Sequence, residues 1–192
     1  MIAPLKKEHT AQVAEIHQSA LSSDFLPSLG FSFLKTLYDG IAEKPGIFGF
    51  VFMEKNEVEG FVVGARTTNT FFREAIKSHF FKLVFYLGLA LIKKPAIITK
   101  IFETLFYPSK SDGSSAELVV LAVDKKFRNK GVGSSLIKSL EKEFRKVKIK
   151  KYKLTVHADK KAIYFYEKLA YDRKSAFTLY DKKWYVYEKK LS

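Results

Sequence analysis

The feature that most constrains the fold is a buried strand that leads, through a short loop, into an amphipathic helix. Residues 116–123, Ala-Glu-Leu-Val-Val-Leu-Ala-Val, are apolar on both faces for most of their length, which is typical of an interior strand. Over residues 131–148, apolar side chains recur at steps of four and three, as on one face of a helix. The pattern predicts a strand–loop–helix unit within a mixed α/β domain.

The loop between these two elements ends in two glycines, Gly131 and Gly133. A helix N-terminus has unpaired backbone N–H groups and the positive end of the helix dipole, so it favours an anion. Glycines permit a positive φ and remove Cβ atoms that would block the approach of a pyrophosphate. Arg128 adds positive charge, and backbone donors can come from Asn129, Lys130, Gly131, Val132, Gly133 and Ser134. We therefore predict a phosphate site; the alternative is a tight turn without a ligand.

Other phosphate-binding loops fit this segment less well. A Walker loop needs Gly-x-x-x-x-Gly-Lys followed by Ser or Thr, and the sequence does not contain it. A dinucleotide-binding loop needs a third glycine three residues after the second, and Leu136 stands there instead.

Two motifs together point to a family. The segment Arg128-x-x-Gly131-x-Gly133, after Leu-Ala-Val-Asp, resembles the acetyl-CoA pyrophosphate motif of the GNAT superfamily of N-acetyltransferases. The run DKKAIYFYEKLAY, residues 159–171, resembles the same family's Asn-x-x-Ala-x-x-Phe-Tyr-Glu-Lys-x-Gly-Phe block. The resemblance covers about residues 116–171. It departs at Asp159, where the family has Asn, and at Ala170, where it has Gly.

The resemblance implies a fold class and a co-substrate. It implies α/β structure: one GNAT-like domain over residues 1–192, with a central mixed sheet flanked by helices and with strands 116–123 and 152–157 splayed apart. The pantetheine arm of acetyl-CoA would lie in that gap and bond to the strand backbone. The implied co-substrate contacts are Leu121, Ala122, Val123, Arg128, Asn129, Lys130, Gly131, Val132, Gly133, Ser134, Asp159 and Tyr166.

The family also implies catalytic roles. Tyr166 matches the tyrosine that protonates the departing thiolate, a role that suits a phenol because it is protonated at neutral pH. Glu117 stands where histone-acetylating members carry a general base; the alternatives are an exposed strand-end glutamate, or deprotonation of the amine through water. Asp24 and Phe25 lie between a helix predicted over residues 8–21 and a second helix predicted to start after Pro27, and they are expected at the edge of the acceptor site.

Composition limits the other possibilities. The chain has no cysteine, and His9, His17, His79 and His157 do not cluster at ligand spacing, so we expect no metal. The formal charge of +14 comes mainly from scattered lysines, which argues against a nucleic-acid partner but suits a polyanionic co-substrate. The most hydrophobic stretch, residues 80–92, is shorter than the roughly 20 residues that span a bilayer, and the N-terminus has no apolar signal core. We expect a cytoplasmic protein without a membrane partner.

One segment lies outside the family pattern. Residues 71–106 are rich in Phe, Leu and Ile and predict an inserted helical pair. We interpret it as extra core or the interface of a possible homodimer; a lid and a surface that meets lipid are the alternatives.

These observations predict an N-acetyltransferase that acts on a primary amine, namely a small amine, an amino sugar or a peptide amine, by direct transfer in a ternary complex. The rival hypotheses are a non-catalytic acyl-CoA-binding regulator on the same fold and a basic nucleic-acid-binding protein. The motifs do not identify the acceptor.

Overall fold

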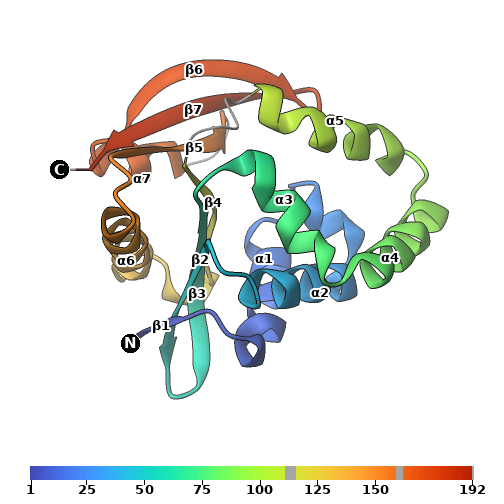
Figure 1. The fold of residues 1–192 in the computed structure, drawn as a ribbon, viewed down its shortest axis with the longest axis horizontal. Coiled ribbons are helices and arrows are strands. Elements are labelled where there is room, and N and C mark those ends of the chain that lie inside the picture. Colours follow the sequence, from blue (N-terminus) through green and yellow to red (C-terminus); the bar gives the residue numbers. More distant parts are fainter. Residues whose placement is uncertain (111–115, 159–161, 192) are drawn as a thin grey trace.

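The computed structural model describes residues 1–110, 116–158 and 162–191, which fold around one mixed sheet (Figure 1). The described strands lie in the order β1-β2-β3-β4-β5-β7-β6. Among them β4 and β5 are the parallel pair, and the other neighbours run antiparallel. The strands are β1 Ile2–Pro4, β2 Ile47–Glu54, β3 Glu57–Ala65, β4 Glu117–Val123, β5 Lys151–His157, β6 Asp172–Leu179 and β7 Lys182–Lys190.

Helices cover both faces of this sheet, as predicted. In Figure 1, α6 and α7 lie on one side, α1 to α4 lie on the other, and α5 returns from α4 toward the β6–β7 hairpin. The helices are α1 Thr10–Ala20, α2 Phe31–Ala42, α3 Thr68–Lys77, α4 Phe80–Lys93, α5 Ile97–Lys110, α6 Val132–Lys146 and α7 Ala162–Lys168. Among the described residues, no helix is long and apolar enough to cross a membrane.

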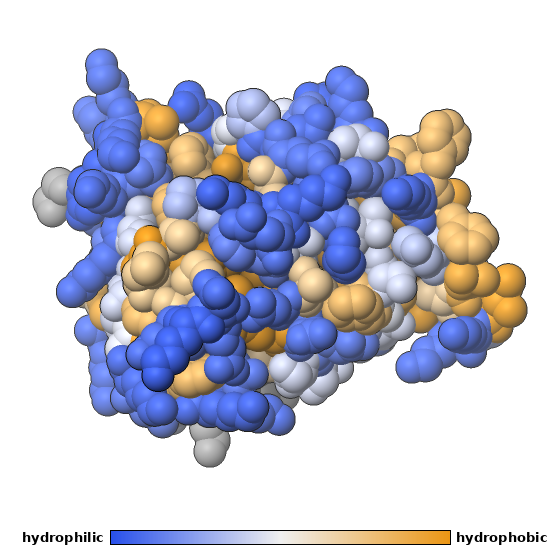
Figure 2. All heavy atoms as spheres, turned by 90° about the horizontal axis from the view of Figure 1, so that it is seen from below, coloured by the Kyte–Doolittle hydropathy of each residue, from blue (hydrophilic) through white to orange (hydrophobic). Residues whose placement is uncertain are grey.

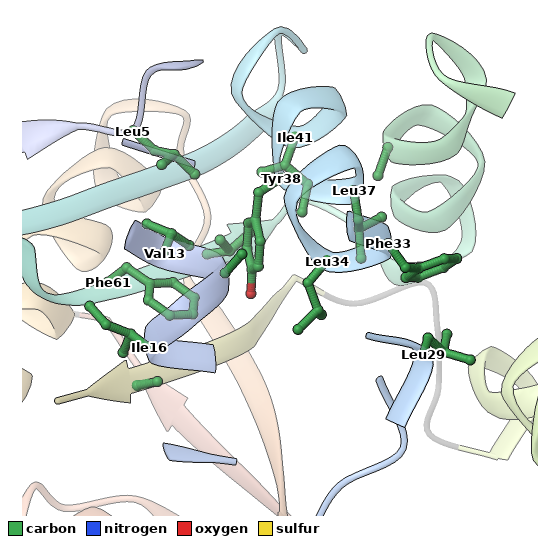
Figure 3. Close-up of a cluster of buried hydrophobic side chains, with 14 of the residues drawn as sticks. Leu5, Val13, Ile16, Leu29, Phe33, Leu34, Leu37, Tyr38, Ile41 and Phe61 are labelled. Carbon is green, nitrogen blue, oxygen red and sulfur yellow. The ribbon is translucent and has the colours of Figure 1, made fainter. Parts of the chain in front are cut away.

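Each face of the sheet has its own hydrophobic core. On one face, α1 and α2 pack Val13 and Leu34 against Phe61 of β3, all three fully buried (Figure 3). On the other face, the stripe of α6 packs Leu140 and Phe144 over the sheet. Burying each such side chain contributes about 2 kcal/mol, so these two cores fix the sheet between the helix layers.

The parallel strands β4 and β5 separate soon after they begin. They pair only where Glu117 lies opposite Lys153 and Leu118 opposite Leu154. At the same level the pairing of β4 with β3 shifts register, because Val119 is an extra residue in β4. Such a bulge bends the strand that carries it. The predicted splay of these two strands is confirmed, and it leaves one edge of β4 without a neighbouring strand.

The segment predicted as a helical pair over 71–106 forms three helices, α3 to α5. The apolar period predicts a single helix as the first member of the pair. The chain turns at Ser78 and His79 instead, which divides this helix into α3 and α4. The division lets α3 cross α2 closely, since a Cβ on Gly40 would lie 2.1 Å from the carbonyl oxygen of Ala75. The insertion also starts earlier than predicted, at Thr68, whose hydroxyl bonds to Glu117 of β4.

Candidate active site

The bulge decides which backbone groups of β4 face the open edge. The N–H of Asp124 donates to the carbonyl oxygen of Glu59 at 2.9 Å, toward β3. Backbone groups of successive strand residues alternate in direction, so Leu121 and Val123 turn theirs away from β3, toward the gap. Ala122 turns its backbone toward β3 instead. Of the three strand residues predicted to contact a co-substrate, Leu121 and Val123 therefore direct their backbone groups toward the open edge of β4.

The loop after β4 delivers further backbone donors to the same place. It contains a 3-10 turn, η3 (Lys125–Phe127), and two residues with positive φ, Asn129 at 62° and Gly131 at 81°. Helix α6 then begins at Val132. The N–H groups of its first turn, on Val132, Gly133 and Ser134, have no helical carbonyl partner and lie at the positive end of the helix dipole. These three N–H groups are the donors that the predicted anion site would use.

The two loop glycines serve different purposes, which the sequence alone did not separate. Around Gly131 no heavy atom lies within 4 Å of an added Cβ, so this position needs glycine for its positive φ. A Cβ on Gly133 would lie 3.2 Å from Cζ of Phe165, so this glycine allows α6 to pack closely on α7.

Two basic side chains border this helix start. The Nε of Arg128 donates to the carbonyl oxygen of Val123 at 3.1 Å, which places the guanidinium at the end of β4. The Lys130 ammonium lies 5.3 Å from the centre of the Phe127 ring. Both cations belong to the loop that leads into α6, and their charge adds to the positive potential around this loop.

A cavity of about 250 Å³ lies where β4 and β5 separate. Strands β4 and β5 and helix α7 line one part of it, and α1, α2 and the β6–β7 turn line the other. Most of its lining is apolar, and the polar groups that face it are few. Of the predicted site residues, Leu121, Tyr166, Glu117, Asp24 and Phe25 all border this one cavity.

Tyr166 reaches the cavity from α7. Its side chain is buried, and the described residues offer its hydroxyl no hydrogen-bond partner. Burial raises the pKa of the Tyr166 phenol well above its usual value of 10.0, because the charged form would lose its hydration. The cavity therefore contains a phenol that keeps its proton at neutral pH.

Glu117 reaches the cavity from the first residue of β4 and is only 2 % exposed. Its carboxylate accepts a hydrogen bond of 2.6 Å from the Thr68 hydroxyl and lies 3.6 Å from the ammonium of Lys153, which is also buried. Both partners stabilise a negatively charged carboxylate. The alternative of an exposed strand-end glutamate is therefore wrong, and a buried cation accompanies the buried carboxylate.

Sequence reasoning gave Lys153 no role, although the alternation along β5 carries a signal. Lys153, Thr155 and His157 occupy alternate positions, and the last two line the cavity. The residues between them, Leu154 and Val156, belong to the core under α6. This period of two indicates a strand with one polar face and one apolar face.

Another missed pair is His17 of α1 with Tyr38 of α2. The Nδ1 of His17 and the Tyr38 hydroxyl share a hydrogen bond of 2.6 Å, and both side chains line the cavity. Burial lowers the pKa of His17 from 6.5 to about 4, partly opposed by the negative charge of Asp24. His17 is therefore neutral at pH 7. In Figure 3, Tyr38 extends from α2 toward α1.

The far side of the cavity is assembled from segments distant in sequence. Phe25 packs against Tyr180 of the β6–β7 turn, with ring centres 5.4 Å apart. The Tyr180 hydroxyl lies 2.6 Å from that of Thr104 on α5, so the insertion reaches the cavity too. Asp24 and Phe25, predicted at the acceptor site, thus share the cavity with Tyr180 and Thr104, which no sequence motif assigned to a site.

One predicted co-substrate residue, Asp159, lies outside the described residues. In the described part of the chain, no three His, Cys, Asp or Glu residues gather as a metal site requires.

Comparisons with known proteins agree with this geometry. Residues 109–182 match the family model described as an acetyltransferase (GNAT) domain. No curated protein matches the chain. Solved structures share its fold at low identity. Ard1 from Thermoplasma volcanium is 17% identical with a TM-score of 0.61, and the match covers 100% of this chain and 97% of that one.

Two further structures give the same result. The ribosomal-protein-S18-alanine N-acetyltransferase from Escherichia coli is 14% identical, with a TM-score of 0.62 and coverage of 100% and 94%. The PaiA N-acetyltransferase from Thermoplasma acidophilum, in complex with coenzyme A, is 15% identical, with a TM-score of 0.58 and coverage of 99% and 98%.

The matched segment contains β4, the glycine loop, α6, β5 and α7, the elements that form the gap and the helix start. Fold and site together define an acyltransferase that uses an acyl-CoA donor. Residues 109–182 thus match a GNAT acetyltransferase domain, and the chain as a whole shares the fold of solved N-acetyltransferases.

Proposed function

We propose that this protein transfers an acetyl group from acetyl-CoA directly to a primary amine within a ternary complex. The observation that carries the proposal is the cavity at the separation of β4 and β5, which borders both the open edge of β4 and the α1–α2 helices. A donor lying along β4 and an acceptor entering beside α1 and α2 would meet in it. Direct transfer needs this meeting, because no nucleophilic cysteine exists to carry the acetyl group between them.

The residues present fit acetyl-CoA. The N–H groups of Val132, Gly133 and Ser134, with the charges of Arg128 and Lys130, suit its pyrophosphate. The outward N–H and C=O of Leu121 suit an amide of the pantetheine arm, which would pair with β4 as an added strand; the outward C=O of Val123 already accepts from Arg128. Once bound, the molecule supplies an activated thioester carbonyl.

We assign the acid role to Tyr166. Its buried phenol retains a proton at neutral pH and borders the cavity, so it can donate that proton to the departing sulfur. The Val123 N–H can donate to the carbonyl oxygen as negative charge develops there.

We assign the base role to Glu117. Its carboxylate faces the cavity, and Thr68 and Lys153 hold it in place and stabilise its charge. That pairing weakens it as a base for direct abstraction. A water molecule between the amine and Glu117 would shorten each proton transfer, and the proposal includes this relay as the alternative path.

For the acceptor, the lining favours a small amine with an apolar body. Leu21, Leu26, Leu37 and Ile41 surround the α1–α2 side of the cavity, and they would leave the hydroxyl groups of an amino sugar unpaired. A peptide amine is the second candidate, because the E. coli structure is named for a ribosomal-protein alanine. A polypeptide would need an open groove leading to the cavity in addition to the cavity itself.

The testing experiment is a thiol-release assay with acetyl-CoA against alkyl and aryl amines, amino sugars and peptides. We expect release of coenzyme A with apolar amines and a higher melting temperature in saturating acetyl-CoA. Stabilisation without turnover on any acceptor would favour the non-catalytic regulator. The absence of both stabilisation and turnover would contradict the proposal outright.

A further inference from the structure

Helices α4 and α5 expose large apolar side chains that no part of the described chain covers. Phe81, Phe85 and Ile92 of α4 are 87%, 62% and 82% exposed, and Leu89, Ile98 and Phe102 are exposed beside them. We call these six residues the α4–α5 patch. Figure 2 shows hydrophobic residues gathered at the end of the molecule where Figure 1 places α4, with hydrophilic residues at their edge.

The patch is not the core-facing side of its helix. Leu83 and Ala90 already bury the opposite side of α4 against the α1–α2 core. Helix geometry places Phe81, Phe85 and Ile92 together on the side away from them, since they lie four and seven residues apart. A helix that is apolar on both sides needs a second partner, because water does not stabilise its outer side.

The charge around the patch indicates the kind of partner. Residues 75–102 contain five lysines and no Asp or Glu. All five lysines are exposed, and within the described residues none of them forms an ion pair. They are Lys77, Lys82, Lys93, Lys94 and Lys100. The partner must therefore accept apolar side chains and supply negative charge over the same area.

We propose that the α4–α5 patch docks this protein on the surface of a bilayer that contains anionic phospholipids. The aromatic and aliphatic side chains enter the interface between headgroups and acyl chains, and the surrounding lysines bind the phosphates. A second copy of the chain complements the patch poorly, because it brings five more lysines and no carboxylate from this segment. The sequence-based expectation of no membrane partner rested on the length of the apolar stretch, which limits spanning and not docking.

The test is flotation of the full chain with two kinds of vesicle, phosphatidylcholine alone and phosphatidylcholine mixed equally with phosphatidylglycerol. We expect binding to the mixed vesicles that weakens as salt rises. Phe81→Ser with Phe85→Ser should abolish it, whereas Tyr164→Ser, which removes an aromatic ring that is 71% exposed on α7, should not. Lys82→Gln with Lys93→Gln should weaken it about five-fold for each charge removed. The matched pair Lys138→Gln with Lys142→Gln, on exposed positions of α6, should change it far less.

Three outcomes would overturn the proposal. One is no binding to either vesicle at low salt. Another is equal loss in the patch variants and the α6 control, which would reduce the effect to the net charge of +14. The third is a dimer in sedimentation equilibrium that the Phe81 and Phe85 substitutions dissociate while vesicles stay unbound. Because none of these measurements needs acetyl transfer, they are independent of the proposed activity.

Discussion

The two sides of the cavity are built by different means. The proposed co-substrate side consists of β4, the glycine loop, α6 and α7, all within residues 117–168, and it offers mainly backbone groups. The proposed acceptor side is assembled from α1, α2, α5 and the β6–β7 turn, and it offers buried side chains such as His17 and Tyr38. The first depends on local backbone geometry and the second on tertiary packing.

This difference explains where specificity lies. A pyrophosphate and a pantetheine arm are constant parts of every acyl-CoA, so a fixed arrangement of N–H donors suffices to hold them. Acceptors vary, and apolar residues such as Leu37 and Ile41 can change without disturbing the strand edge or the helix start. Substitutions on the first side should therefore alter binding or turnover with any acceptor, and substitutions on the second should alter which acceptor reacts.

The largest effect is expected from Tyr166→Phe, on the co-substrate side. Loss of the proton donor should lower turnover about a thousand-fold while the affinity for acetyl-CoA stays within a few-fold. Steady-state kinetics and titration calorimetry measure the two quantities. Tyr164→Phe is the matched control, because that ring is 71% exposed, and it should leave both unchanged. Equal turnover in the Tyr166 variant and the wild type would remove Tyr166 from the acid role.

The next largest effect is a loss of stability, and it is expected where the co-substrate side and the acceptor side of the cavity meet. Lys153→Met removes a buried ammonium 3.6 Å from Glu117 and should lower the free energy of unfolding by about 3 kcal/mol. In the same strand, Lys151 pairs with Glu188 at 2.9 Å on the surface, so Lys151→Met should cost less than about 1 kcal/mol. Urea unfolding of the two variants measures the contrast. Similar values for both would mean that Lys153 and Glu117 do not form a buried pair.

On the acceptor side, His17 should make stability depend on pH. Its pKa is about 4 in the folded protein and 6.5 when exposed, so between these values the unfolded chain binds more protons. Stability is therefore complete above pH 6.5 and is lost as the pH falls toward 4. Between pH 7 and pH 5, His17 should remove about 2 kcal/mol from the free energy of unfolding. His17→Gln should flatten this slope; an unchanged slope would mean that His17 titrates normally.

The smallest effects come from two glycines with open space around an added Cβ, one in the loop on the co-substrate side and one in α4, away from the cavity. Gly131→Ala places a side chain at φ 81° and should destabilise the protein by about 1 kcal/mol and weaken acetyl-CoA binding several-fold. Gly88→Ala, within α4, should stabilise it by about 1 kcal/mol through helix propensity. Thermal unfolding measures both signs. A stabilising Gly131→Ala would show that the loop does not need its positive φ.

The same contrast explains how much could be predicted from the sequence. The strand 116–123 and the helix after Gly131 follow from hydrophobic period and from the glycines between them, and the structure confirms both elements. Lys153, His17 and Tyr180 could not be placed, because each reaches the cavity through contacts with elements distant in sequence. The break between α3 and α4 was missed for a related reason. Packing against α2 outweighs the continuous apolar period there.

The most direct test of the central claim is amide hydrogen exchange with and without acetyl-CoA. The account predicts slower exchange at Leu121 and Val123 and at the amides of residues 129–134, with little change along α4. Protection confined to other segments, or no protection at saturating acetyl-CoA, would contradict a co-substrate site at the open edge of β4 and the start of α6.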